Sequence, residues 1–154
     1  LLGNKSLNYN CLDTYEFEKL RYQGIIQTLK KAGNTGILMH HGKNNKYLLE
    51  NYNNIDTMYQ LKYFLSVIML LPTLFLNLNG SYCRKSDSFA LVNEYFAQDR
   101  LELITAASKI RNDWPVKQIK KIGSNRIPDW LIEELGKDYL KRGAALAELF
   151  EGKV

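Results

Sequence analysis

The stretch Tyr63-Phe-Leu-Ser-Val-Ile-Met-Leu-Leu-Pro-Thr-Leu-Phe-Leu76 decides the fold, because it carries no charged side chain and is bounded by Lys62 and Asn77. A membrane span needs about 20 apolar residues, so this shorter run is typical of a helix buried in protein. Its apolar residues surround the helix axis, which predicts burial on several sides. Pro72 removes a backbone donor and predicts a bend near the helix centre.

Helical patterns lie on both sides of this stretch. Residues such as Asp, Ser and Thr favour helix starts, and Gly favours helix ends, so they delimit each segment. Gly136 and Gly143, seven apart on one helix face, indicate either a close helix contact or a weak point. The expected helices span Thr14–Ala32 (capped by Asp13 or Thr14, ended by Gly33-Asn34), Thr57–Leu78 (capped by Asp56, ended by Gly80), Asp87–Phe96 (capped by Ser86 or Asp87), Asp99–Asn112, and Ile127-Pro128-Asp129 to Phe150.

The order of these helices predicts an all-α fold: an up-and-down bundle of four to five helices around a long bent central helix. The length of 154 residues fits a single domain, residues 1–154. Residues 1–12 can form an extended tail, and residues 113–126 form a basic loop before the last helix. Residues Gly36–Asn54 fit a short hairpin or a helix, and short apolar runs do not decide between them.

Composition excludes several classes of protein. Hydrophobic residues make up 45% and charged residues 24%, as in soluble globular proteins, which argues against disorder and fibrous repeats. Cys11 and Cys83 are far apart and lack metal-ligand spacing, so we expect reduced thiols. No secretory signal pattern is visible. We therefore expect a cytoplasmic protein with no membrane association.

Basic residues gather in one segment. The net charge of the chain is +5, and residues 113–126 contribute four basic residues against one acidic residue. A localised positive charge suits a phosphate or an acidic partner, and Trp114 can stack on a base or plug the core. A solvated loop is the alternative. The candidate phosphate- or nucleic-acid-binding residues are Lys117, Lys120, Lys121 and Arg126, together with Arg84 and Lys85 after the central helix.

Motifs of known enzymes are absent from the sequence, including phosphate-binding loops, nucleophile elbows and the zinc-protease motif. His40 and His41 are adjacent, so they point in different directions, and neither has a Cys or carboxylate three or four residues on. We expect no metal and no cofactor. His40 is a weak catalytic candidate. Arg111 is expected to be half-buried and paired to a carboxylate, or alternatively to contact a phosphate or RNA.

The central stretch, the following Ser81-Tyr-Cys-Arg-Lys-Ser-Asp-Ser-Phe89 and the helix ending Ala107-Ser-Lys-Ile-Arg-Asn112 resemble the HEPN superfamily. That superfamily includes helical substrate-binding domains that accompany minimal nucleotidyltransferases. The resemblance covers residues 57–112 and implies an up-and-down bundle that often dimerises. Active HEPN ribonucleases carry an Arg, a polar residue and then a His, so the resemblance makes Arg111 and Asn112 weak catalytic candidates. Val116, Lys117 and Gln118 stand where the His would be.

These observations favour a non-catalytic or accessory module that binds a partner or a substrate. The expected partners are a second copy, another protein such as a separately encoded nucleotidyltransferase, or a nucleic acid or nucleotide. A nucleic-acid-binding protein using the basic loop is the first alternative. An unconventional ribonuclease built on Arg111 and a distant His is the second.

Overall fold

The computed structural model describes residues 2–36, 38, 55–113 and 126–153, and the side chains from residue 15 onward. The segment 39–54, for which hairpin and helix were both open, lies outside the described residues, as does 114–125. In chain order the described elements are α1 (Leu2–Thr35), α3 (Met58–Leu78), α4 (Lys85–Leu91), two short 3-10 turns (Val92–Glu94 and Gln98–Leu101), α5 (Glu102–Asp113), α6 (Asp129–Leu135) and α7 (Tyr139–Glu151).

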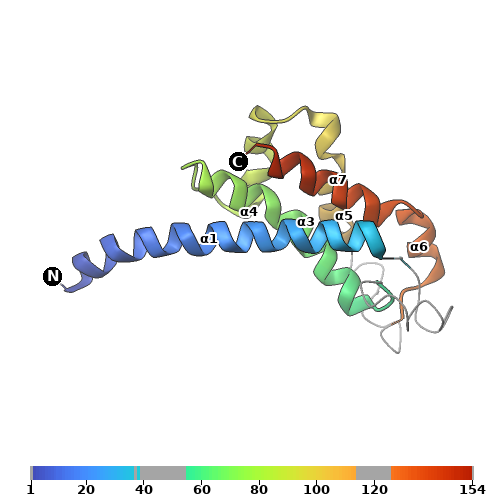
Figure 1. The fold of residues 1–154 in the computed structure, drawn as a ribbon. Helices are drawn as coiled ribbons and strands as arrows, with labels where there is room; N and C mark the ends of the chain where they lie inside the picture. The colour runs from blue at the N-terminus through green and yellow to red at the C-terminus, as the bar shows by residue number, and fades with distance from the viewer. Residues whose placement is uncertain (1, 37, 39–54, 114–125, 154) are drawn as a thin grey trace.

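The predicted all-α bundle is confirmed, with α1, α3, α5 and α7 as its long members (Figure 1). Leu38 bridges Ile55, which brings the end of α1 to the start of α3. Asn77 near the end of α3 donates to Glu18 of α1, so these two helices are antiparallel. Helix α7 packs against α1 and α3, while α5 packs against α3 and α7. Lys30 pairs with Glu151 while Gly33 lies against Leu140, so α7 also runs antiparallel to α1, as neighbouring helices do in an up-and-down bundle.

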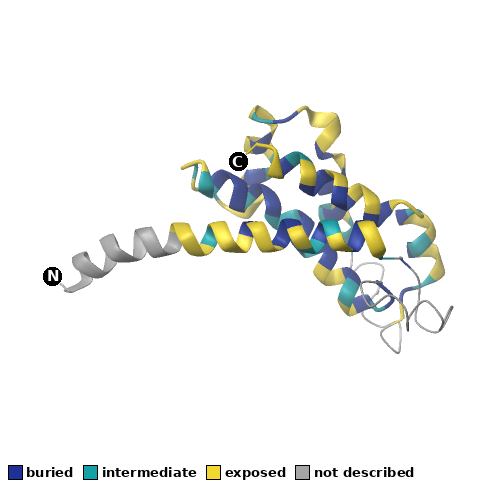
Figure 2. Ribbon diagram, viewed as in Figure 1, coloured by how far each residue is buried: buried dark blue, intermediate teal, exposed yellow. Residues whose placement is uncertain are grey.

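Helix α3 is the centre of the core and contacts α1, α4, α5 and α7. Figure 2 shows buried residues on several sides of it. Thr57 is its N-cap and forms a capping box with Gln60, so the cap lies one residue after the predicted Asp56, which is itself buried. The helix continues through Pro72, and the bend expected there stays a prediction. Its buried side chains are Met58, Leu61, Phe64, Leu65, Val67, Ile68, Leu71, Pro72, Leu74, Phe75 and Leu76.

Among the described residues, α3 is also the one helix long and apolar enough to span a membrane by length and composition. Of its most apolar window, 56% is buried within the protein. Core helices of bundles and membrane-spanning helices share this length and apolar composition. The expected cytoplasmic location stays a prediction.

Helix α1 differs from the prediction at both ends. It begins at Leu2, so residues 2–12 are helical instead of an extended tail, and Asp13 and Thr14 lie inside the helix. Cap-forming residues are tolerated in helix interiors when nothing else stops the chain. At the other end Gly33 lies within the helix and is buried. A Cβ at this position would overlap that of Ala144 and come within 2.7 Å of the Leu140 carbonyl oxygen. Gly33 thus permits close packing of α7.

Two other predicted helices are divided in the structure. The segment predicted as Asp87–Phe96 is α4 from Lys85 to Leu91 followed by a 3-10 turn, with Arg84 rather than Ser86 or Asp87 at its N-cap. The predicted final helix breaks at Gly136, whose φ of 89° and ψ of 161° are accessible mainly to glycine. Gly143 instead makes a close contact, because an added Cβ would lie 2.7 Å from Phe64 Cζ. Of the two alternatives predicted for these glycines, Gly136 is the weak point at which the helix breaks, and Gly143 is the close helix contact.

We expect Gly33→Ala and Gly24→Ala to change stability in opposite directions, although both glycines lie in α1. Gly33→Ala should lower the free energy of unfolding by about 1–3 kcal/mol, because α7 must move away. Gly24 is exposed with open space at its Cβ, so Gly24→Ala should raise that free energy by about 1 kcal/mol. Urea denaturation of the two variants measures both values. Equal effects would contradict the close approach of α1 and α7.

Gly136→Ala should lower the free energy of unfolding by about 1–3 kcal/mol through backbone strain alone. No atom lies within 4 Å of its added Cβ, so steric contact does not contribute. Gly152→Ala is the matched control, since Gly152 has an ordinary helical φ of −68°. Urea denaturation should show little loss for the control. A stable Gly136→Ala protein would indicate that α6 and α7 join as one helix.

Candidate functional site

Among the described residues, the weak catalytic candidates are not brought together into one site. Arg111 is half-buried in the last turn of α5, and the neighbouring Asn112 is exposed. Arg111 also has an interaction partner, which agrees with the structural role considered for it. His40 lies outside the described residues, as does its neighbour His41. The described part of the chain therefore contains no histidine that could serve as the acid–base partner of Arg111.

The predicted basic residues fall at two opposite ends of α3. Arg84 and Lys85 are exposed and follow its C-terminal end. Arg126 bridges Thr57 at its N-terminal end. A helix of 21 residues is about 30 Å long, so the two groups do not form one surface. The remaining candidates, Lys117, Lys120 and Lys121, lie outside the described residues.

Two exposed tyrosines lie at the same end of α3 as Arg126. Tyr59 and Tyr63 are 75% and 57% exposed, four residues apart on the first turns of α3, with exposed Lys62 between them. The Thr57–Arg126 bridge places Arg126 at the same end of the helix. Sequence reasoning treated α3 as buried on several sides and missed this face. The sequence signal for this exposed face was the presence of two Tyr and a Lys at positions where the rest of α3 carries aliphatic residues.

The first part of α1 projects from the body of the bundle (Figure 1). Glu18 accepts a hydrogen bond from Asn77 at 3.4 Å, where α3 comes to its end. Phe17 and Leu20 are 65% and 67% exposed, although both are large apolar residues. They lie opposite the helix face that buries Tyr22 and Ile26. This exposed face of α1 is a candidate interface.

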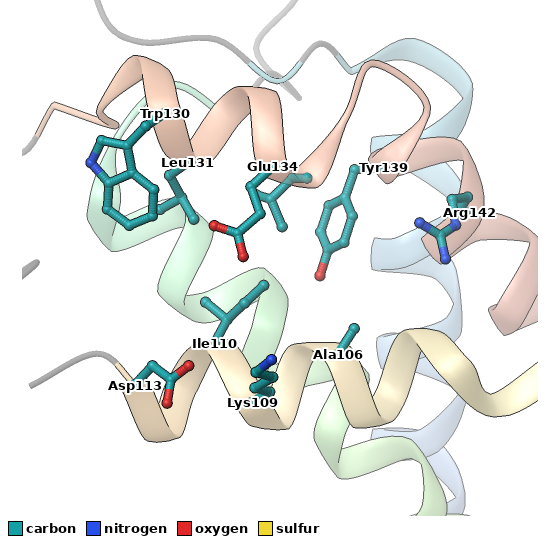
Figure 3. A pocket seen from close by; sticks show the side chains of 10 residues that line it. Ala106, Lys109, Ile110, Asp113, Trp130, Leu131, Glu134, Tyr139 and Arg142 are labelled. Carbon is teal, nitrogen blue, oxygen red and sulfur yellow. The ribbon is translucent and has the colours of Figure 1, made fainter. Parts of the chain in front are cut away.

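A cavity of about 150 Å³ lies between α5, α6 and the start of α7 (Figure 3). It combines apolar walls with four charged residues and one indole, supplied by three helices. Sequence reasoning missed it, because its residues come from separate helices and form no motif. Its lining consists of Ala106, Lys109, Ile110 and Asp113 of α5, Trp130, Leu131, Glu134 and Leu135 of α6, and Tyr139 and Arg142 of α7.

Tyr139 is the most unusual residue of this cavity. It is 2% exposed, and its ring lies 5.7 Å from that of Phe64. Its hydroxyl oxygen has no hydrogen-bond partner among the residues that the structure describes. Burial raises the pKa of the hydroxyl well above its usual range, and the positive charge of Arg142 partly opposes this shift. The hydroxyl is therefore protonated at neutral pH and available as a donor.

Tyr22 is a second buried tyrosine whose hydroxyl lacks a hydrogen-bond partner in the described part of the chain. It borders a wider hollow of about 430 Å³, together with Lys19, Gln23 and Glu151. Burial and the charge of Glu151 raise the pKa of its hydroxyl. Glu151 is paired with Lys30 at 3.1 Å.

Within the described residues, no three His, Cys, Asp or Glu side chains lie close enough together to hold a metal ion. Cys83 carries a free, half-buried thiol, and the side chain of Cys11 lies outside the described part of the chain.

Comparisons of the chain with protein-family models, with curated proteins and with solved structures find no match. The resemblance to the HEPN superfamily therefore stays a prediction, and the function is argued from the residues and geometry of this chain.

Proposed function

We propose that the chain is an accessory helical module without catalytic activity, and that it works as a homodimer joined through the exposed face of α1. The observation that carries this proposal is the exposure of Phe17 and Leu20 on a helix that extends beyond its neighbours. Large apolar side chains grouped on one exposed face are a common mark of a protein interface.

The length of α1 also supports a partner for the N-terminal part of this helix, which projects beyond the bundle. Helix α1 has 34 residues and would be about 51 Å long, whereas α7 has 13 residues and covers about 20 Å of it. Isolated helices of a dozen residues are marginal in water, and packing supplies most helix stability in proteins. A second molecule against the projecting segment would supply that packing.

The chemistry of the exposed face favours a second copy as this partner. Around Phe17 and Leu20 the helix carries both signs of charge, with Glu16 and Glu18 close to Lys19 and Arg21. In an antiparallel pair of identical helices, acidic residues of one copy can meet basic residues of the other. The resemblance to the HEPN superfamily, whose bundles often dimerise, supports the same conclusion.

The double variant Phe17→Ser/Leu20→Ser should convert the dimer to a monomer without unfolding the bundle. Both side chains are exposed, so the core stays intact while the apolar contact between copies is lost. Light scattering after size exclusion should give twice the chain mass of 17.8 kDa for the wild type and 17.8 kDa for the variant.

Tyr59→Ser is the matched control for this experiment. Tyr59 is 75% exposed and lies at the start of α3, whereas Glu18, the neighbour of Phe17, contacts Asn77 at the other end of that helix. The control should remain a dimer. A wild-type protein that stays monomeric at about 100 μM would overturn the proposed homodimer.

A nucleic-acid-binding function is the second candidate, and the exposed pair Tyr59 and Tyr63 favours it. Aromatic side chains beside cations are the usual platform for unpaired bases. Here the two tyrosines share one end of α3 with Lys62 and Arg126. Arg126 lies 3.9 Å from Asp129 with its side chain half-exposed, so this weak ion pair can yield to a phosphate.

For this second candidate, Tyr59→Ala/Tyr63→Ala should weaken binding of a labelled single-stranded RNA by about tenfold or more, since stacking contributes about 1–3 kcal/mol per base. Fluorescence anisotropy at 50 and 200 mM salt measures the affinity and its salt dependence. Tyr82→Ala serves as the control, because Tyr82 is as exposed as Tyr59 but follows the opposite end of α3. Unchanged affinity in the double variant would exclude these tyrosines as a binding platform.

A further inference from the structure

A buried hydroxyl points into the cavity between α5, α6 and α7. Tyr139 is 2% exposed, and within residues 2–36, 38, 55–113 and 126–153 its hydroxyl has no hydrogen-bond partner. Figure 3 shows this hydroxyl pointing into the space between α6 and α5. Buried polar groups nearly always have hydrogen-bond partners, so an exception calls for an explanation. A ligand that accepts a hydrogen bond inside the cavity would explain it, because the protonated hydroxyl can donate.

Positive charge acts at this hydroxyl. Arg142 lowers the pKa of the Tyr139 hydroxyl, against the larger effect of burial, so its charge is felt there. Lys109 borders the same cavity from α5 (Figure 3). Arg142 and Lys109 are exposed, and within the same described ranges neither takes part in an ion pair. A carboxylate suits these three donors, because it can accept hydrogen bonds from a hydroxyl and from charged nitrogen groups at once.

The two acidic residues that line the cavity limit where an anion can bind. Asp113 is the last residue of α5, and in Figure 3 it lies toward the opposite end of the cavity from Arg142. Glu134 has an interaction partner of its own, so we assign it no contact with the ligand. The carboxylate of a ligand therefore belongs at the end of the cavity formed by Tyr139 and Arg142.

The middle of the cavity suits an apolar body. Ile110 lines it from α5, and the buried Leu131 and Leu135 line it from α6 (Figure 3). A cavity of about 150 Å³ admits a body of about one benzene ring, smaller than most drug-sized ligands. The ligand therefore combines one negative charge with a compact apolar body.

We propose that this cavity binds a small monocarboxylate whose apolar body is about the size of one benzene ring. The Tyr139 hydroxyl and the Arg142 guanidinium hold the carboxylate, and the Lys109 ammonium adds a second positive charge. The apolar body lies against Ile110 and Leu131. The site is built from α5, α6 and α7 and not from the exposed face of α1, so it does not depend on the proposed homodimer.

The binding test uses the full-length protein with benzoate as the reference probe. Calorimetric titration should give a dissociation constant of about 1 mM or lower, as expected for so small a ligand. Benzamide has nearly the same shape but no charge, so it should bind at least about tenfold more weakly. The longer 2-naphthoate keeps the carboxylate but exceeds the cavity, so it should also bind at least about tenfold more weakly.

The variant Tyr139→Phe should weaken benzoate binding by about tenfold, because the hydrogen bond to the carboxylate is lost. Without ligand, the same variant should be at least as stable as the wild type, since it removes a buried hydroxyl that has no partner in the described ranges. Tyr22→Phe is the matched control: it removes the other such hydroxyl and should leave the affinity for benzoate unchanged.

The double variant Lys109→Gln/Arg142→Gln tests the charges independently of the buried hydroxyl. Both positions are exposed, so the bundle should stay folded while benzoate binding weakens by about tenfold. The proposal is overturned if benzoate does not bind at about 10 mM, or if benzamide or 2-naphthoate binds as tightly as benzoate. Wild-type affinity for benzoate in either Tyr139→Phe or the double variant would also overturn it.

Discussion

Burial of α3 on several sides is the constraint on which the rest of the structure depends. Its apolar side chains point in more directions than one neighbour can cover, so α1, α4, α5 and α7 surround it. Each fully buried Leu or Phe contributes about 1.5–3 kcal/mol, so leaving one side to water would cost several kcal/mol. The aromatic rings of Phe96 and Phe150 complete this packing, each against Phe75.

The second constraint is the close approach that glycines permit around α7. Gly33 lets α7 approach α1, and Gly143 lets Phe64 of α3 reach the α7 backbone. Together they hold the N-terminal end of α7 close to the core. Tyr139 begins α7, so the same packing buries its ring and carries its hydroxyl to the cavity. The cavity beside Tyr139 is thus a consequence of how tightly α7 packs.

Much of the fold could be predicted, because helix periodicity and caps are local properties. The extents of α3 and α5 follow the prediction closely. The predicted start of α1 was wrong, because Asp13 and Thr14 can lie inside a helix as well as cap one. The unbroken last helix was wrong because only the observed φ of Gly136 distinguishes a break from a close contact.

The candidate sites were harder to predict than the fold. The sequence determined that the chain is an all-α bundle around one apolar helix, since composition and spacing along the chain encode burial. Only the tertiary structure decided that Arg84 and Arg126 lie at opposite ends of α3, and that α1 extends past α7. It alone brought Trp130, Tyr139 and residues of α5 around one cavity, because that arrangement depends on packing between helices distant in sequence.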